Sequence, residues 1–254
     1  MQLEGQIAIV TGASSGMGAA TARYFAGRGV SVGLFDINEE ALEAIAVETG
    51  GIAIACDVTN AASVESAVEQ LGDALGVARI VVNCAGIAPA KRIVGRDGPM
   101  ALEQFSRVIE VNLIGSFNIM RCAAAAMMPE EPLTASGERG VIISTASVAA
   151  YEGQIGQAAY AASKGGIVSL TLPAAREFAR FGIRVMTIAP GLIATPMLLG
   201  MPSEIQDSLA ASVPFPKRLG DPVEYARLVE HIISNEMLNG EVIRLDGAIR
   251  MQPS

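Results

Sequence analysis

Short apolar runs alternate along the chain with longer segments in which apolar residues recur every three or four positions. The short runs consist almost entirely of Val, Ile, Leu and Ala, which is the pattern of strands covered on both faces. The longer segments have the period of amphipathic helices. Strands and helices that alternate in this way predict repeated βαβ units and a parallel sheet. Seven strands are predicted, at residues 7–11, 31–36, 52–56, 80–83, 141–144, 184–188 and 241–245.

Six helices are predicted between these strands, at residues 16–28, 39–49, 61–75, 102–127, 157–181 and 222–233. Capping signals mark the start of the last one, where Asp221 is followed by Pro222 and Glu224. The irregular stretch 189–220 contains five prolines and is too long for a plain connection, so we expect a lid or substrate loop there. The whole pattern predicts an α/β fold: one Rossmann-type doubly wound domain over residues 1–254 with a seven-stranded parallel sheet.

The composition narrows the classes of function. Hydrophobic residues make up 51% of the 254 positions and charged residues 17%, and the net charge is −8. This balance argues against disorder, against a nucleic-acid partner and against an anionic membrane surface. We find no segment that predicts a membrane span or a signal peptide, so a cytoplasmic location is expected. Three cysteines and one histidine in no metal-binding spacing predict neither a disulfide framework nor a metal site.

A glycine-rich turn joins the first predicted strand to the first helix. Gly12, Gly16 and Gly18 allow a tight turn, a close approach of the backbone to a pyrophosphate and close packing of the helix on the strand. The N-terminus of the helix would supply unpaired N–H groups to the anion. The alternative is an ordinary strand-to-helix turn.

An acidic residue ends the second strand, eighteen positions after Gly18. The Asp36 carboxylate would hydrogen-bond the adenosine ribose diol and would repel a 2′-phosphate. No cation is found in the glycine-rich turn or directly after Asp36, so NAD is predicted rather than NADP. The alternative role of Asp36 is a cap for the next helix, which Asn38 can already provide.

Tyr160 and Lys164 are four residues apart in a predicted helix, which places both side chains on one face. A cation about 4 Å from the phenol would favour the phenolate by about 4 kcal/mol at most, so Tyr160 is the candidate general acid and base. Ser147 follows a strand at the carboxyl edge of the sheet and could hold the substrate oxygen. Asn112 lies in the middle of a helix, where an amide suggests a polar role facing the site. The alternatives are a solvated Tyr–Lys pair and a satisfied core amide.

Taken together, these motifs resemble the short-chain dehydrogenases/reductases, and the resemblance covers essentially the whole chain. It rests on Thr11-Gly12-x-x-x-Gly16-x-Gly18, Asp57-Val58, Asn83-Cys84-Ala85-Gly86, Asn112, Ser147, Tyr160-x-x-x-Lys164 and Pro190-Gly191 with Thr195. The resemblance implies that Asn112 holds a water next to Lys164, and that the catalytic residues are Ser147, Tyr160, Lys164 and Asn112. It also implies a nicotinamide cofactor bound by Gly12, Ser15, Gly16, Met17, Gly18, Asp36, Asp57, Val58, Asn83, Cys84, Ala85, Gly86, Tyr160, Lys164, Pro190, Gly191, Ile193 and Thr195.

Within that family, residues 140–253 look most similar to members that act on 3-hydroxyacyl-CoA thioesters. This implies NAD, a homotetramer, a short or branched 3-hydroxyacyl-CoA substrate and a place in fatty acid and isoleucine degradation. The 88–99 segment looks shorter than its counterpart in those members, where it helps to hold the CoA end. A broad-specificity ketone/secondary alcohol dehydrogenase is therefore the alternative.

Two more distant functions are compatible with parts of the sequence. Residues 12–16 also spell the G-x-S-x-G turn of serine hydrolases around Ser14, and His231 follows late in the chain. The other possibility is a non-catalytic regulator that senses NAD with the same fold. Both leave the combination of Asn112, Ser147, Tyr160 and Lys164 without a purpose.

Overall fold

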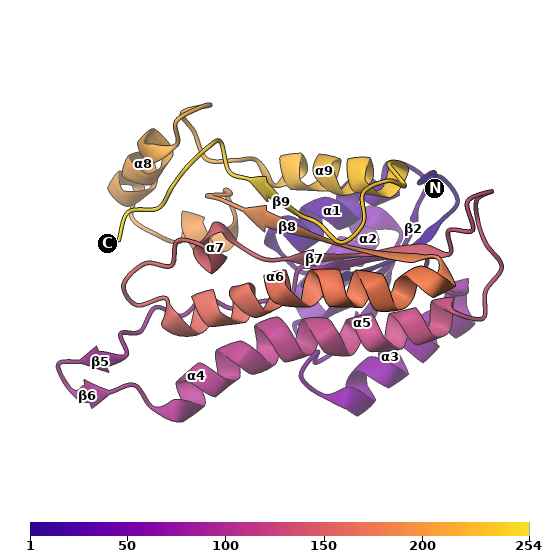
Figure 1. Cartoon of the computed structure of the whole chain (residues 1–254), viewed down its shortest axis with the longest axis horizontal. Coiled ribbons are helices and arrows are strands. Elements are labelled where there is room, and N and C mark those ends of the chain that lie inside the picture. The colour runs from indigo at the N-terminus through magenta and orange to yellow at the C-terminus, as the bar shows by residue number, and fades with distance from the viewer. Residues whose placement is uncertain (254) are drawn as a thin grey trace.

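The computed structural model describes residues 1–253 and has a central parallel sheet with helices on both faces (Figure 1). The seven strands follow the order β3-β2-β1-β4-β7-β8-β9, and every pair in this sheet is parallel. Their bounds are β1 Ile7–Thr11, β2 Ser31–Asp36, β3 Ile52–Ala55, β4 Ile80–Asn83, β7 Gly140–Thr145, β8 Ile183–Pro190 and β9 Val242–Leu245. The fold class and the seven strands predicted from the sequence are confirmed.

Two layers of helices bury the two faces of this sheet. One face is covered by α1 (Gly16–Ala26), α2 (Glu39–Thr49) and α9 (Pro222–Ser234), and its core includes Phe25, Leu34 and Tyr225. The other is covered by α3 (Ala61–Leu75), α5 (Gly115–Met127) and α6 (Ala158–Phe178), around Ile142 and Leu71. Burial of both faces is the reason why the strands are nearly continuous in apolar residues.

The order of the strands reverses between β1 and β4, because β2 and β3 extend the sheet in one direction and β7 to β9 extend it in the other. In an open parallel sheet, this switch point leaves a crevice outside the carboxyl ends of the strands. The glycine-rich turn after β1 lies at that crevice, together with the chain that leaves β4 and β7.

The capping signals read from the sequence are present. Asp221 accepts a hydrogen bond from Val223 N at 2.8 Å, and Glu224 accepts one from Asp221 N at 2.8 Å, which completes a capping box on α9. Asn38 caps α2 by accepting from Ala41 N at 3.2 Å.

Several predicted boundaries were wrong. Helix α1 ends at Ala26 rather than at 28, because the chain turns at Gly27 to Gly29, and Gly29 has a φ of 74°. The predicted helix 102–127 consists of α4 (Leu102–Ile109), a π-helical segment (Glu110–Ile114) and α5. The predicted helix 157–181 ends as α6 at Phe178 and continues as one 3-10 turn.

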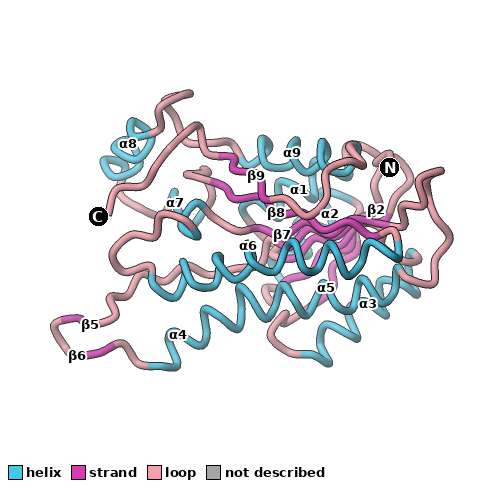
Figure 2. The backbone as a smooth tube through the Cα atoms, in the orientation of Figure 1, coloured by secondary structure: helices cyan, strands magenta, loops and turns pink. Residues whose placement is uncertain are grey.

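The stretch 189–220, predicted as an irregular loop, holds two further helices (Figure 2). Strand β8 extends to Pro190, and then α7 (Pro196–Leu199) and α8 (Ser203–Ser212) follow. Two of the five prolines lie at the starts of these helices, where proline is compatible with helical structure: Pro196 occupies the first turn of α7, and Pro202 precedes α8.

A short hairpin, which was not predicted, projects from the molecule between β4 and α4 (Figure 1). It pairs β5 (Val94–Gly95) with β6 (Gly98–Pro99) in antiparallel fashion. Two-residue strands have no detectable alternation, which is why the pattern of the sequence did not indicate them.

By length and apolar composition, one helical stretch, Leu102–Met127, could cross a membrane. In its most apolar window, 56% of the residues are buried within the protein, as is usual for a core helix.

Candidate active site

A cavity of about 550 Å³ lies at the carboxyl edge of the sheet. All but two of the residues that the sequence assigned to the site line this cavity, from the glycine-rich turn at one end to Ser147 and Tyr160 at the other. The two exceptions are Asn83 and Asn112. Elements that are far apart in the chain therefore bring the predicted cofactor residues and the predicted catalytic residues to one place.

The glycine-rich turn has the geometry that an anion site needs. Gly12 has a φ of 63° and Gly16 a φ of 55°, both in the left-handed region. A Cβ on Gly12 would lie 2.8 Å from Ala85 N, and a Cβ on Gly18 would collide with the carbonyl of Gly12. The side chain of Ser15 makes no capping bond to α1, so the first N–H groups of this helix remain available at the cavity. These residues fit a pyrophosphate.

Asp36 is held at the edge of this turn. Its Oδ2 accepts hydrogen bonds from Ser14 N at 3.1 Å and from Ser14 Oγ at 2.7 Å, and its Oδ1 accepts from Asn38 N at 3.1 Å. Because Asn38 provides the cap of α2, Asp36 is free to face the cavity that it lines.

The hydrogen bond between Ser14 and Asp36 also argues against a serine hydrolase. Ser14 Oγ donates to Asp36 and not to a histidine, and His231 is exposed on α9 and is not among the residues that line the cavity. A nucleophilic serine would need its base within hydrogen-bond reach.

Asp57 and Val58 line the wall beyond β3. Asp57 Oδ1 accepts from Thr59 N at 2.9 Å and from Thr59 Oγ1 at 2.7 Å, and these bonds hold the pKa of the carboxyl below its usual range. Asn118 Nδ2 donates to the carbonyl of Val58 at 2.9 Å, which fixes the backbone at this point.

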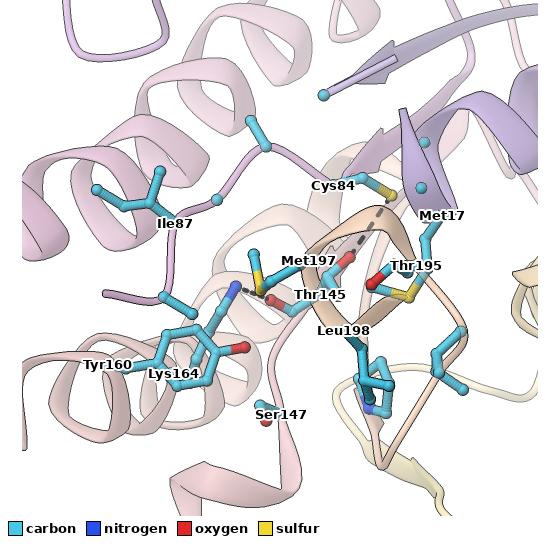
Figure 3. A pocket seen from close by; sticks show the side chains of 18 of the residues that line it. Met17, Cys84, Ile87, Thr145, Ser147, Tyr160, Lys164, Thr195, Met197 and Leu198 are labelled. Carbon is cyan, nitrogen blue, oxygen red and sulfur yellow. Dashed lines mark hydrogen bonds between the residues drawn. The ribbon is translucent and has the colours of Figure 1, made fainter. Parts of the chain in front are cut away.

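Helix α6 presents Tyr160 and Lys164 to the cavity, and Ser147 faces them from the end of β7 (Figure 3). Lys164 is 4% exposed, and its Nζ donates to the carbonyl of Thr145 at 2.7 Å. Burial lowers the pKa of Lys164 to about 8. Ser147 Oγ accepts from Ala149 N at 3.1 Å, which orients this hydroxyl.

In the protein alone, the phenol is not acidified as the sequence spacing predicted. Burial raises the pKa of Tyr160, and the Ser147 hydroxyl opposes this only in part. Lys164 Nζ lies 5.8 Å from the centre of the Tyr160 ring and is engaged with Thr145, so its charge does not compensate for the desolvation. The expected pairing of the two side chains on one helix face is confirmed, whereas the expected fall in the pKa of Tyr160 was wrong.

Thr145 connects this site to the opposite face of the sheet. Its Oγ1 lies 2.6 Å from the carbonyl of Asn83 and 2.7 Å from Tyr225 Oη. Since the single hydroxyl proton of Thr145 is donated to Asn83, Tyr225 is the donor in the second bond. The Cys84 thiol lies 3.7 Å from both hydroxyls, and burial raises its pKa.

Asn112 lies at the centre of the π-helical segment and is fully buried. Its Oδ1 accepts from Ile87 N at 2.8 Å, while its Nδ2 donates to the carbonyl of Ile87 at 2.9 Å and to Ser163 Oγ at 2.9 Å. This is the satisfied core amide that the sequence left as an alternative. Asn83 is also buried, with its Nδ2 3.4 Å from Ser144 Oγ, and it touches the site only through its carbonyl.

Several lining residues were not identified from the sequence. Some of them come from the segment before α6, from residues 197–209 and from the end of the described chain: Gln154, Gln157, Met197, Leu198, Met201, Leu209 and Met251. The helix-forming composition of 203–212 could have indicated α8. No local signal indicates Met251, because only the tertiary fold brings it to the cavity.

Comparison with known proteins agrees with this geometry. Residues 6–205 match the short chain dehydrogenase family. The chain is 52% identical to 3-hydroxyacyl-CoA dehydrogenase type-2 of Homo sapiens, over 99% of this chain and 97% of that protein. The Bos taurus protein of the same name is 53% identical over the same shares.

A solved structure shows the same fold. The crystal structure of 3-hydroxyacyl-CoA dehydrogenase type-2 from Mycobacterium avium superposes with a TM-score of 0.92 at 43% identity, over 98% of each chain. The chain therefore belongs to the short-chain dehydrogenase family and is an oxidoreductase that acts on CH–OH groups. Members of this family generally depend on a nicotinamide dinucleotide, which the glycine-rich turn fits.

Proposed function

We propose that this protein is an NAD-dependent dehydrogenase that interconverts a short or branched 3-hydroxyacyl-CoA and the corresponding 3-oxoacyl-CoA. The observation that carries the proposal is the convergence of Ser147, Tyr160 and Lys164 on one end of a cavity whose other end has the dinucleotide turn and Asp36. The names of the relatives support the choice of substrate.

Asp36 supports NAD over NADP. Its carboxylate is fixed by Ser14 beside the turn, where it would accept hydrogen bonds from a ribose diol and repel a 2′-phosphate. When bound, the nicotinamide supplies or accepts the hydride of the reaction.

The chain's own residues would manage the proton. Tyr160 holds its proton at the phenol oxygen in the protein alone, because burial raises its pKa, and this is the state that a general acid for carbonyl reduction needs. Ser147 would hold the substrate oxygen beside that phenol. Lys164 is positioned to exchange a proton near neutral pH, since its pKa is about 8. Asn112 would fix the backbone at Ile87 and the hydroxyl of Ser163, and any water held there would lie next to Lys164.

Cations near the cavity support a CoA thioester. Ala90 lines the cavity, and the residues that follow it toward the β5–β6 hairpin include Lys91, Arg92 and Arg96, all exposed. Lys91 N donates to the carbonyl of Gly156 at 2.8 Å, so this cationic segment is fastened next to the start of α6. Three positive charges there would attract the phosphates of CoA.

We also propose a homotetramer. Apolar side chains remain exposed on the outer surfaces of α4, the π-helical segment, α5 and α6: Leu102, Ile114, Phe117 and Leu172. An apolar surface of this kind is typical of a contact between subunits.

The test compares three ketones with NADH: acetoacetyl-CoA, an acetoacetyl thioester of N-acetylcysteamine, and acetophenone. We expect kcat/KM to be highest for acetoacetyl-CoA. Replacing Lys91, Arg92 and Arg96 together by Ala should raise KM for acetoacetyl-CoA and leave the small thioester unaffected. Arg180→Ala, in the 3-10 turn that follows α6, is the matched control. Equal or better turnover of acetophenone by the parent enzyme would favour the broad ketone dehydrogenase instead.

A further inference from the structure

The 247–253 segment follows the last strand and continues beyond the carboxyl edge of the sheet (Figure 1). It runs alongside the residues that lead into α6. Gln154 Nε2 donates to the carbonyl of Gln252 at 2.9 Å, and Ile155 N donates to the carbonyl of Pro253 at 2.9 Å. The end of this segment is therefore attached to the stretch between Ser147 and Tyr160.

Glu152 anchors the other part of the segment. Its Oε2 accepts a hydrogen bond from Met251 N at 3.0 Å. The same carboxylate receives Arg244 at 2.8 Å and 3.2 Å, and it lies 3.4 Å from Arg250 Nε. Arg244 in turn donates to the carbonyl of Ile249 at 3.0 Å. The Glu152 carboxylate thus fixes the backbone of Met251 directly. It also fixes Arg244, which in turn holds the backbone at Ile249.

This anchoring brings the Met251 side chain to the cavity wall. Tyr160, Ser147, Gln154 and Gln157 line the cavity as well, and Gln154 is bonded to the residue after Met251. The dinucleotide turn lies at the other end, after β1. Because the segment that carries Met251 is bonded to Gln154, it belongs to the Ser147–Tyr160 part of the cavity, where its side chain would contact the substituent on the reacting carbon rather than the cofactor.

The side chains in this part of the cavity suit an apolar substituent on the reacting carbon. Met251 contributes a thioether, and α7, the connection after it and α8 contribute Met197, Met201 and Leu209 to the same cavity. Methionine is flexible and polarizable, so it packs against acyl groups of different shape. None of these four side chains offers a charge to the group they would surround.

From this arrangement we infer that Met251 is a specificity-determining residue that limits the length of the acyl chain on the reacting carbon, and that Glu152 is the positioning residue that holds Met251 in place. The inference deepens the proposed function and rests on it for the choice of acyl-CoA substrates. The segment that carries Met251 is fixed by backbone hydrogen bonds, so it cannot move away from a long acyl chain as a free loop could. Substrates with longer acyl chains should therefore have a lower kcat/KM.

The experiment measures kcat/KM for 3-oxoacyl-CoA substrates of four, six, eight and ten carbons with NADH. Met251→Ala removes most of the side chain, and a hydrophobic pocket discriminates by about tenfold or more for each methylene. We expect the ratio of kcat/KM for eight carbons to that for four carbons to rise at least about tenfold. The affinity for NADH should not change. Met251→Leu, which conserves volume, should keep the parent ratio.

Met237→Ala is the matched control, because Met237 is 92% exposed and does not line the cavity. It should leave the ratio unchanged. Met251→Phe gives the opposite test, since it narrows the cavity and should lower kcat/KM for the longer chains first. This second variant keeps the inference testable if Met251→Ala does not fold. An unchanged ratio in the Ala or Phe variant that binds NADH would overturn the assignment of Met251.

Glu152→Gln tests the positioning role. It keeps the shape of the side chain but weakens the bonds to Arg244 and Met251, so it should raise the ratio of eight to four carbons in the same direction as Met251→Ala. When Glu152→Gln is combined with Met251→Ala, it should not raise the ratio further, because the side chain that Glu152 positions has already been removed. Additive effects would show that Glu152 acts on the site by another route.

The parent enzyme separates failure of this inference from failure of the proposed function. If the parent does not reduce acetoacetyl-CoA, the proposed substrate class is wrong. The same variants are then measured with 2-pentanone and 2-nonanone. A higher ratio for the nine-carbon ketone in Met251→Ala would support the wall, and an unchanged ratio would overturn it.

Discussion

The ammonium of Lys164 and the main-chain carbonyl of Thr145 form a buried hydrogen bond of 2.7 Å. The hydroxyl of Thr145 is bonded at 2.7 Å to Tyr225, which comes from α9 on the other face of the sheet. Thr145 therefore joins the buried Lys164 to a side chain in the core on the opposite face of the sheet.

The buried ammonium makes the stability of the protein depend on pH in a definite direction. The pKa of Lys164 falls from 10.5 to about 8 on folding. Below pH 8 the lysine is charged in both states, and the cost of burying the charge is fully present. As the pH rises from 8 to 10.5, the folded state loses its proton first, so the contribution of Lys164 to stability increases.

Lys164→Met should remove this dependence. Between pH 7 and pH 9.5, the parent should gain about 2 kcal/mol of unfolding free energy relative to the variant. Urea unfolding of both proteins at the two pH values provides the measurement, and all other titrating groups cancel in the difference. An equal change in both proteins would mean that Lys164 titrates at its ordinary pKa.

Tyr160→Phe removes the proposed proton donor and leaves the aromatic ring in place, so it should abolish most of the activity. We expect kcat to fall by about 10²–10⁴-fold, the usual contribution of general acid–base catalysis. Binding of NADH, measured by fluorescence titration, should remain close to that of the parent. Retention of the parent rate would show that another group supplies the proton.

Asp36→Ala should weaken the preference for NAD. Loss of the carboxylate removes the acceptor for the ribose diol and the repulsion of a 2′-phosphate, so the ratio of kcat/KM for NADH to that for NADPH should fall at least about tenfold, or about 1.4 kcal/mol. Ser14→Ala is the control: it removes the 2.7 Å hydroxyl bond to Asp36 but leaves the charge, and the preference should persist. A ratio that stays the same in Asp36→Ala would assign the choice to other residues.

Tyr225→Phe removes one buried hydroxyl without changing the packing of the ring. The lost bond to Thr145 should lower the unfolding free energy by about 1 kcal/mol. Tyr151→Phe, with a side chain that is 49% exposed, should change it by less than about 0.5 kcal/mol. Equal effects of the two substitutions in urea unfolding would contradict a stabilising bond at Thr145.

The parts of the fold set by local patterns could be predicted from the sequence. Six of the strands were placed to within a residue at both ends, because most of them are buried on both faces and carry nearly continuous apolar runs. The glycine-rich turn and the spacing of Tyr160 and Lys164 identified residues at both ends of the cavity. Both motifs could be recognised because backbone sterics and helix geometry depend on only a few neighbouring residues.

What could not be predicted depends on contacts between distant segments. Met251 lines the cavity, and its backbone N–H is bonded to Glu152, 99 positions away in the chain, so no local pattern indicates this contact. The hydroxyls of Thr145 and Tyr225 are 80 positions apart. The raised pKa of Tyr160 follows from how deeply the tertiary structure buries it, whereas the sequence showed only the nearby lysine.

The π-helical segment has a consequence for the tolerance of this region to changes in length. Its five residues include a bond from Gly115 N to the carbonyl of Glu110, one residue longer than an α-helical bond. Such a segment is equivalent to one extra residue in a regular helix. Deleting one residue from it would leave the buried faces of α4 and α5 in phase, and it would rotate Asn112 away from Ile87. A relative shortened by one residue here would keep the same core and still lose the bonds by which this amide holds Ile87, which lines the cavity.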